Sequence, residues 1–190
     1  LVVLFITFFS CPTQAQQEKN IELAISVFHN QGEYDKALNL LNNKKNKGNA
    51  TDMVFFLEAR TLYLKGEFKH AANIYVNLLN SGIKEANYSL SQCYAQMNKP
   101  ELSTKYLALY LKEHDKKLPN LIKKDPAFKN IQNSEHWKKL WATNWYSTYE
   151  MELMEAEFKL NNKKYSDALK LLDEIVSKRK KGDEAYYLKA

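Results

Sequence analysis

The side chains best suited to chemistry in this sequence are not spaced as catalytic or metal-binding groups are. His29, His70, His114 and His136 lie far apart, and no His-x-x-x-His or Cys-x-x-Cys pair could begin a metal site. No Gly-x-Ser-x-Gly sequence presents a nucleophilic serine, and the dispersed glycines form no phosphate-binding loop. We therefore expect no catalytic residue, no bound metal and no cofactor.

The sequence contains two cysteines, and they have different expected fates. Cys93 shares an apolar helical face with Leu90, Tyr94 and Met97, which favours a small buried side chain over a reactive thiol. Cys11 lies in an N-terminal segment that we expect to be removed. The remaining thiol cannot form an internal disulfide, so the fold must depend on packing.

The N-terminal segment resembles a secretory signal peptide that lacks its basic leader. Residues 1–9 are apolar and uncharged, and a helix breaker and small residues follow as far as Ala15. The apolar run is too short to span a bilayer. We expect residues 1–15 to be a truncated signal peptide, with a lipoprotein signal or a truncated anchor as alternatives. The expected location is the periplasm or the cell envelope.

The net charge of +6 is spread mainly over mixed helical surfaces, where basic residues alternate with Asp and Glu. Two basic runs, at residues 44–47 and 178–181, lie at predicted helix ends. Cations at a helix C-terminus complement the helix dipole, and the alternative is a patch for an anionic partner or a membrane surface. We expect no nucleic-acid partner.

The sequence repeats itself with a period that is typical of helical hairpins. The segment Gly-Glu-Tyr-Asp-Lys-Ala at residues 32–37 recurs as Gly-Glu-Phe-Lys-His-Ala at residues 66–71, and 66 − 32 = 34. A third copy has Asn98 in place of the turn glycine, and a fourth, weaker copy surrounds Tyr165. The residues that define the repeat are Gly32, Tyr34, Ala37, Gly66, Phe68, Ala71, Asn98, Ser103, Tyr165 and Ala168.

These copies resemble the tetratricopeptide repeat (TPR), whose Gly-x-aromatic-x-x-Ala turn joins two antiparallel helices. The resemblance implies an all-α solenoid of stacked hairpins, in which glycine permits the tight turn, the ring wedges between helices and alanine permits close approach. We expect three TPR-like hairpins in residues 18–116. A fourth hairpin and the truncated start of a fifth are expected in residues 148–190.

Residues 117–147 interrupt the period and are expected to form short helices that bridge the hairpins. Asp125 with Pro126 predicts the start of one helix, and Ser134 predicts the cap of another. Trp137, Trp141 and Trp145 are four residues apart, which predicts one stripe of rings. Packing is the favoured role of this stripe, and a platform for glycan or peptide is the alternative.

The TPR resemblance also implies a function, because the first helix of each hairpin in such arrays lines a groove that holds a peptide. The groove-facing positions are Glu22, Ser26, His29, Phe56, Arg60, Tyr63, Tyr88, Gln92 and Ala95. Of these we expect His29, Phe56, Arg60, Tyr63, Tyr88 and Gln92 to contact a peptide or protein partner. For Phe56 and Tyr63, filling a gap between hairpins is an equal alternative. The predicted function is a non-catalytic scaffold; an enzyme or sensor beyond residue 190 and a glycan-binding module are the alternatives.

Overall fold

The protein is all-helical over the residues that the computed structural model describes, which are 14–48, 50–113, 116–178 and 188. No strand occurs among these residues, which confirms the predicted fold class. The predicted signal segment lies outside this part of the chain, apart from residues 14 and 15 at the start of the first helix. Within the described ranges, no helix combines the length and apolar character needed to cross a bilayer.

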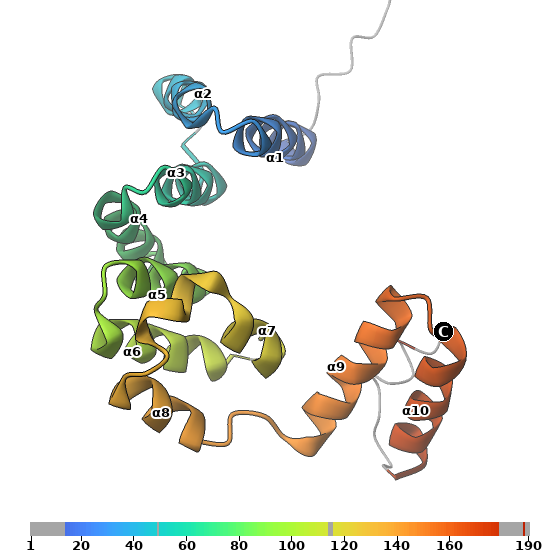
Figure 1. Cartoon of the computed structure of the whole chain (residues 1–190). Helices are drawn as coiled ribbons and strands as arrows, with labels where there is room; N and C mark the ends of the chain where they lie inside the picture. Colours follow the sequence, from blue (N-terminus) through green and yellow to red (C-terminus); the bar gives the residue numbers. More distant parts are fainter. Residues whose placement is uncertain (1–13, 49, 114–115, 179–187, 189–190) are drawn as a thin grey trace, which may run out of the picture. The chain divides into compact units, whose positions relative to one another are not determined.

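The chain forms two compact units, residues 1–107 and 108–190. Successive helices of the first unit pack in chain order, from α1 on α2 through to α4 on α5, as a stacked hairpin array requires (Figure 1). The helices are α1 (Gln14–Asn30), α2 (Tyr34–Asn46), α3 (Asp52–Leu64), α4 (Phe68–Asn80), α5 (Ala86–Gln96) and α6 (Pro100–Leu111), the last of which continues into the second unit.

Four hairpin turns share one backbone conformation, although only two of them contain glycine. The left-handed position has φ of 71° at Gly32, 89° at Gly66, 52° at Asn98 and 59° at Lys163. At each turn this residue donates its backbone N–H to the carbonyl oxygen of the residue three positions earlier. The residue that follows it donates its N–H to the carbonyl oxygen five positions earlier. These bonds close the preceding helix and reverse the chain. The left-handed conformation of Asn98 agrees with the tolerance of asparagine for such turns.

A small residue lies five positions after each left-handed residue, on the second helix of each hairpin. Ala37, Ala71, Ser103 and Ala168 are all completely buried. Serine is accommodated because Ser103 Oγ donates to the carbonyl oxygen of Ser91 at 2.8 Å, so its buried hydroxyl has a partner. The position therefore requires a small side chain, but the side chain can be polar if it has a hydrogen-bond partner.

The aromatic residue after the turn does not have the same environment in every hairpin. Phe68 is half-buried and packs edge-on against Tyr63, with ring centroids 5.3 Å apart. Tyr165 in the fourth hairpin is 58% exposed, so the expectation of a wedged ring is wrong at this position. The buried core of that hairpin is aliphatic and includes Leu153, Ala156, Leu172 and Ile175, and the ring that packs against it is that of Tyr149 instead of Tyr165.

In the second unit, three short helices follow α6. They are α7 (Pro119–Lys124), the 3-10 helix η1 (Pro126–Ile131) and α8 (Glu135–Ala142). The predicted caps are present, because Asp125 Oδ1 accepts from the N–H of Ala127 at 2.9 Å and Ser134 Oγ accepts from that of Trp137 at 3.2 Å.

The three tryptophans do not form one stripe, which corrects the sequence-based expectation. Helix α8 ends at Ala142, so Trp145 lies outside it, and its indole N–H donates to the carbonyl oxygen of Leu140 at 2.7 Å. Trp137 is only 7% exposed and lies between Phe128 and Trp141, at centroid distances of 5.3 and 5.8 Å. Packing is thus the role of Trp137, and the three rings do not present a common platform.

The fourth hairpin consists of α9 (Thr148–Asn161) and α10 (Tyr165–Lys178), which pack against each other. The predicted fifth hairpin lies outside the described residues, except that Leu188 packs on the core of α9 and α10. Helix α9 begins with a capping box, in which Ser147 Oγ accepts from the N–H of Glu150 and the Glu150 carboxylate accepts from that of Ser147.

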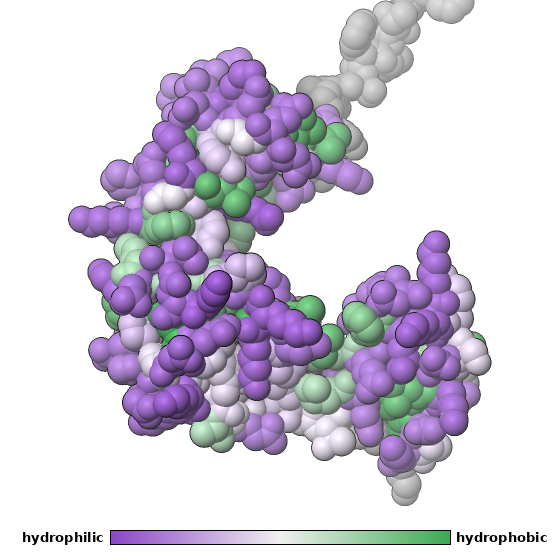
Figure 2. Space-filling model, in the orientation of Figure 1, coloured by the Kyte–Doolittle hydropathy of each residue, from purple (hydrophilic) through white to green (hydrophobic). Residues whose placement is uncertain are grey.

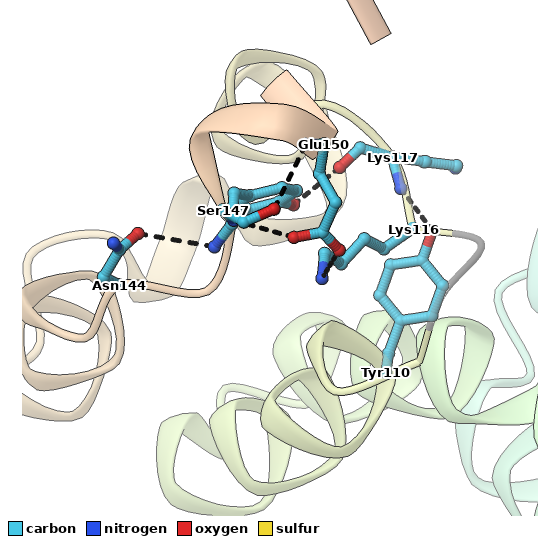
Figure 3. Close-up of polar contacts among 7 residues, drawn as sticks. Tyr110, Lys116, Lys117, Asn144, Ser147 and Glu150 are labelled. Carbon is cyan, nitrogen blue, oxygen red and sulfur yellow. Dashed lines mark hydrogen bonds and ion pairs between the residues drawn. The ribbon is translucent and has the colours of Figure 1, made fainter. Parts of the chain in front are cut away.

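A polar network joins the residues after α6 to the start of α9 (Figure 3). Lys116 Nζ lies 2.7 Å from Glu150 Oε1, and the lysine side chain is only 6% exposed. Lys117 donates its N–H to Tyr110 Oη at 2.7 Å and accepts from Tyr146 Oη at 2.6 Å. The lysine and the Ser147 N–H lower the pKa of Glu150 to about 2. Each polar group therefore has a partner where the short-helix segment meets the fourth hairpin.

Candidate partner-binding face

The shared turn conformation places equivalent residues at the same position on α1, α3 and α5. Ser26, Arg60 and Gln92 each lie six residues before the left-handed residue of their hairpin. Ser26 and Arg60 are exposed and Gln92 is half-buried. We call these three residues the polar row, because they repeat across three successive first helices and leave polar groups accessible.

Arg60 is the charged member of the polar row. Its side chain is exposed and makes no hydrogen bond or ion pair with any residue that the structure describes. Its charge nevertheless acts on His29 of α1 and on Tyr75 of α4. The guanidinium therefore lies near the junction of the first two hairpins, where its five N–H donors remain available for a carboxylate or carbonyl group.

His29, predicted as a groove contact, joins the first hairpin to the second. Its Nε2 lies 2.9 Å from Thr61 Oγ1, and Thr61 is completely buried. Because the Thr61 hydroxyl donates to the carbonyl oxygen of Leu57 at 2.7 Å, it accepts from His29, which fixes the proton on Nε2. Burial, and then the charge of Arg60, lower the pKa of His29. Burial beside Arg60, rather than the hydrogen bond itself, therefore favours the neutral imidazole.

Two of the predicted aromatic contacts pack inside the second hairpin. Phe56 is half-buried and meets Tyr75 edge-on, with ring centroids 5.3 Å apart. Tyr63 makes the corresponding contact with Phe68. Both rings therefore stabilise the pairing of α3 with α4 within one hairpin, whereas the packing alternative placed them between hairpins, and only their remaining exposed edges can meet a partner.

The third hairpin offers fewer accessible positions than expected. Tyr88 is 7% exposed and Ala95 is completely buried, so of the groove positions predicted on α5 only Gln92 retains a substantial exposed fraction. The accessible part of the predicted groove is therefore Glu22 and the polar row, with the exposed edges of His29, Phe56 and Tyr63. Sequence reasoning missed the role of Thr61, whose signal is a hydroxyl residue at helical spacing from the apolar residues Val54 and Leu57.

The groups that could do chemistry are dispersed or buried. Among the described residues, no three His, Cys, Asp or Glu side chains gather closely enough to hold a metal ion. Cys93 is completely buried, and burial raises the pKa of its thiol to about 12, so the nucleophilic thiolate is disfavoured at neutral pH. The arrangement suits non-covalent binding.

Comparison with known proteins agrees with the hairpin geometry. Residues 26–41, which span the end of α1, the first turn and the start of α2, match the family model described as tetratricopeptide repeat. No curated protein and no solved structure is significantly similar to the chain. Tetratricopeptide repeats are generally non-catalytic interaction modules, so the repeats suggest a protein-interaction scaffold. The match at the first repeat and the recurrence of its turn support a tetratricopeptide-repeat protein.

Proposed function

We propose that this protein is a scaffold that holds an extended peptide segment of a partner along the polar row. The observation that carries the proposal is the exposed Arg60 guanidinium, which has no ion-pair partner among the described residues and lies between Ser26 and Gln92 in register. An arginine of this kind binds a carboxylate through two parallel hydrogen bonds. The preferred ligand is therefore a peptide with an acidic side chain or a free C-terminus.

The neighbouring side chains suit the rest of such a ligand. The Gln92 amide carries both donors and acceptors for a peptide backbone. The Ser26 hydroxyl, which donates to the Leu23 carbonyl oxygen at 2.8 Å, can accept from a peptide N–H at the other end of the polar row. The exposed edges of Phe56 and Tyr63 add apolar contact area beside Arg60. The surface thus combines one charge anchor with polar groups that recognise a backbone.

Contacts between the first two hairpins support a pre-formed binding face. The His29–Thr61 hydrogen bond joins α1 to α3, and Lys45 Nζ of α2 lies 2.6 Å from Glu58 Oε1 of α3. Both members of this ion pair are mostly buried, with side chains 23% and 15% exposed. A face held in this way loses little conformational freedom on binding, so a modest contact area suffices.

The test is a selection of peptides from a random twelve-residue display library on the intact chain, followed by fluorescence anisotropy with the selected peptides. Acidic residues should be enriched, and Arg60→Ala should weaken binding by about 10- to 100-fold, the usual effect of a charge-assisted hydrogen bond. The control is Lys69→Ala, because Lys69 is an exposed cation on α4, outside the polar row. Equal affinities for the wild type and Arg60→Ala, at unchanged melting temperature, would remove the polar row as the site.

The proposal includes a place of action in the cell envelope. The apolar, uncharged run at residues 1–9 supports it, because such a run followed by small residues is typical of an export signal. Fractionation of cells that express the complete gene with a C-terminal tag tests this part. The tagged protein should leave the cytoplasm, and the version without residues 1–15 should remain there; cytoplasmic retention of both would contradict it.

A further inference from the structure

One short segment has a net positive charge nearly as large as that of the whole chain. Residues 116–147 contain seven lysines and two acidic residues, a net charge of +5, whereas the whole chain carries +6. The lysines are Lys116, Lys117, Lys123, Lys124, Lys129, Lys138 and Lys139, and the acids are Asp125 and Glu135. Five of the seven lysines lie on α7, η1 and α8, and the segment is separate from the two basic runs at residues 44–47 and 178–181.

Much of this charge is accessible and uncompensated. Four of the lysines are exposed and form no ion pair with a described residue; they are Lys123, Lys124, Lys129 and Lys139. Lys138 is paired with Glu135, and Lys116 is buried against Glu150. The surface over α8 is strongly hydrophilic in Figure 2. Four like charges without counter-ions repel one another, so an anionic surface would relieve that repulsion.

The fold brings the basic ends of the short helices together. Lys123 Nζ lies 4.5 Å from the centroid of the Trp141 ring on α8, and Gln132 donates its side-chain amide to the Lys123 carbonyl oxygen at 2.7 Å. The C-terminal end of α7 therefore adjoins α8. Leu121, two residues before Lys123, is 50% exposed, so an apolar side chain stands within the basic surface.

We propose that this basic surface, formed by α7, η1 and α8, binds the headgroup layer of an anionic phospholipid membrane. Every basic residue in the segment except His136 is a lysine, and lysine ammonium groups act as point charges on headgroup phosphates without needing planar geometry. Arginine would be expected on a surface that reads nucleic-acid bases, because its guanidinium forms two hydrogen bonds to one guanine. The exposed Leu121 can enter the boundary between headgroups and acyl chains, as apolar residues of peripheral surfaces do.

The test is co-sedimentation of the intact chain with vesicles of phosphatidylcholine that contain about 30% phosphatidylglycerol, in about 0.1 M NaCl. Binding should be absent with pure phosphatidylcholine and should be lost in about 1 M NaCl, where charges are screened beyond about 3 Å. The triple variant Lys123→Gln/Lys124→Gln/Lys139→Gln should bind about 100-fold less, because each lysine near an anionic surface contributes about fivefold.

The matched control is Lys47→Gln/Lys69→Gln/Lys99→Gln, which removes the same charge from exposed lysines of the first unit and should bind as the wild type does. Leu121→Ser keeps the charge and should weaken binding several-fold. Circular dichroism of each variant verifies that it is folded. The proposal is overturned if the wild type does not sediment with the anionic vesicles, if both triple variants lose binding equally, or if duplex DNA binds more tightly than the vesicles.

Discussion

His29 Nε2 lies 2.9 Å from Thr61 Oγ1, and this hydrogen bond connects the first helix of one hairpin to the first helix of the next. The contact lies beside Arg60, whose charge acts on the imidazole. The residues that stack the hairpins are therefore neighbours of the residues proposed to bind a partner. Stability and binding can be separated by substituting His29 and Arg60 independently.

The stability of the protein should depend on the protonation of His29. Burial and Arg60 lower the pKa of His29 below its ordinary value of 6.5, so below that pH the unfolded chain binds a proton more readily than the folded one. Stability should therefore fall as the pH falls through about 6.5. Melting temperatures at about pH 7.5 and 5.5 should show a smaller decrease for His29→Gln than for the wild type. Equal decreases would show that His29 is not protonated differently on folding.

The ion pair of Lys116 with Glu150 should stabilise the second unit at neutral pH. Glu150→Gln should lower the free energy of unfolding by about 1 kcal/mol, because the mostly buried Lys116 loses its partner. The pKa of Glu150 is lowered from 4.5 to about 2, so this stabilisation is complete above about pH 4.5 and is lost as the pH falls through about 2.

Urea denaturation at several pH values measures this effect. Glu157→Gln is the matched control, since Glu157 is an exposed glutamate on the same helix and forms no ion pair with a described residue. It should leave the free energy of unfolding nearly unchanged. A loss as large as that of Glu150→Gln would indicate a general effect of charge on α9.

Replacing the non-glycine residue in the fourth turn should stabilise the protein. Lys163 has φ of 59°, a left-handed conformation that costs an L-residue about 1 kcal/mol or more. Lys163→Gly should therefore raise the free energy of unfolding of the second unit by about 1 kcal/mol, whereas Gly66→Ala should lower that of the first by a similar amount. Lys164→Gly is the control and should not stabilise, because Lys164 has no positive φ. If calorimetry shows no increase in the free energy of unfolding for Lys163→Gly, the left-handed backbone at Lys163 is not strained.

The hairpins could be predicted from the sequence because their turns depend on local chemistry. Glycine at residues 32 and 66, with a small residue five positions later, specifies both the left-handed turn and the close helix contact. Asn98 could be recognised as a substitute because asparagine tolerates that conformation. Lys163 has no such preference, so the sequence indicated the fourth hairpin only through the weaker copy around Tyr165.

Other features depend on tertiary packing, which spacing alone does not specify. The predicted tryptophan stripe required a continuous helix from Trp137 to Trp145, but α8 ends at Ala142. The spacing likewise did not indicate that Tyr88 is only 7% exposed. The hydrogen bond of His29 with Thr61 spans 32 residues, so local periodicity gives no direct indication of it.

The most direct test of the binding face is an NMR titration of the uniformly ¹⁵N-labelled chain with a peptide selected from the library. The largest amide shift changes should occur at Ser26, Arg60 and Gln92, at a spacing that follows the repeat. Changes confined to α2 and α4, or to residues 116–178, would contradict a binding face formed by the first helices of the hairpins.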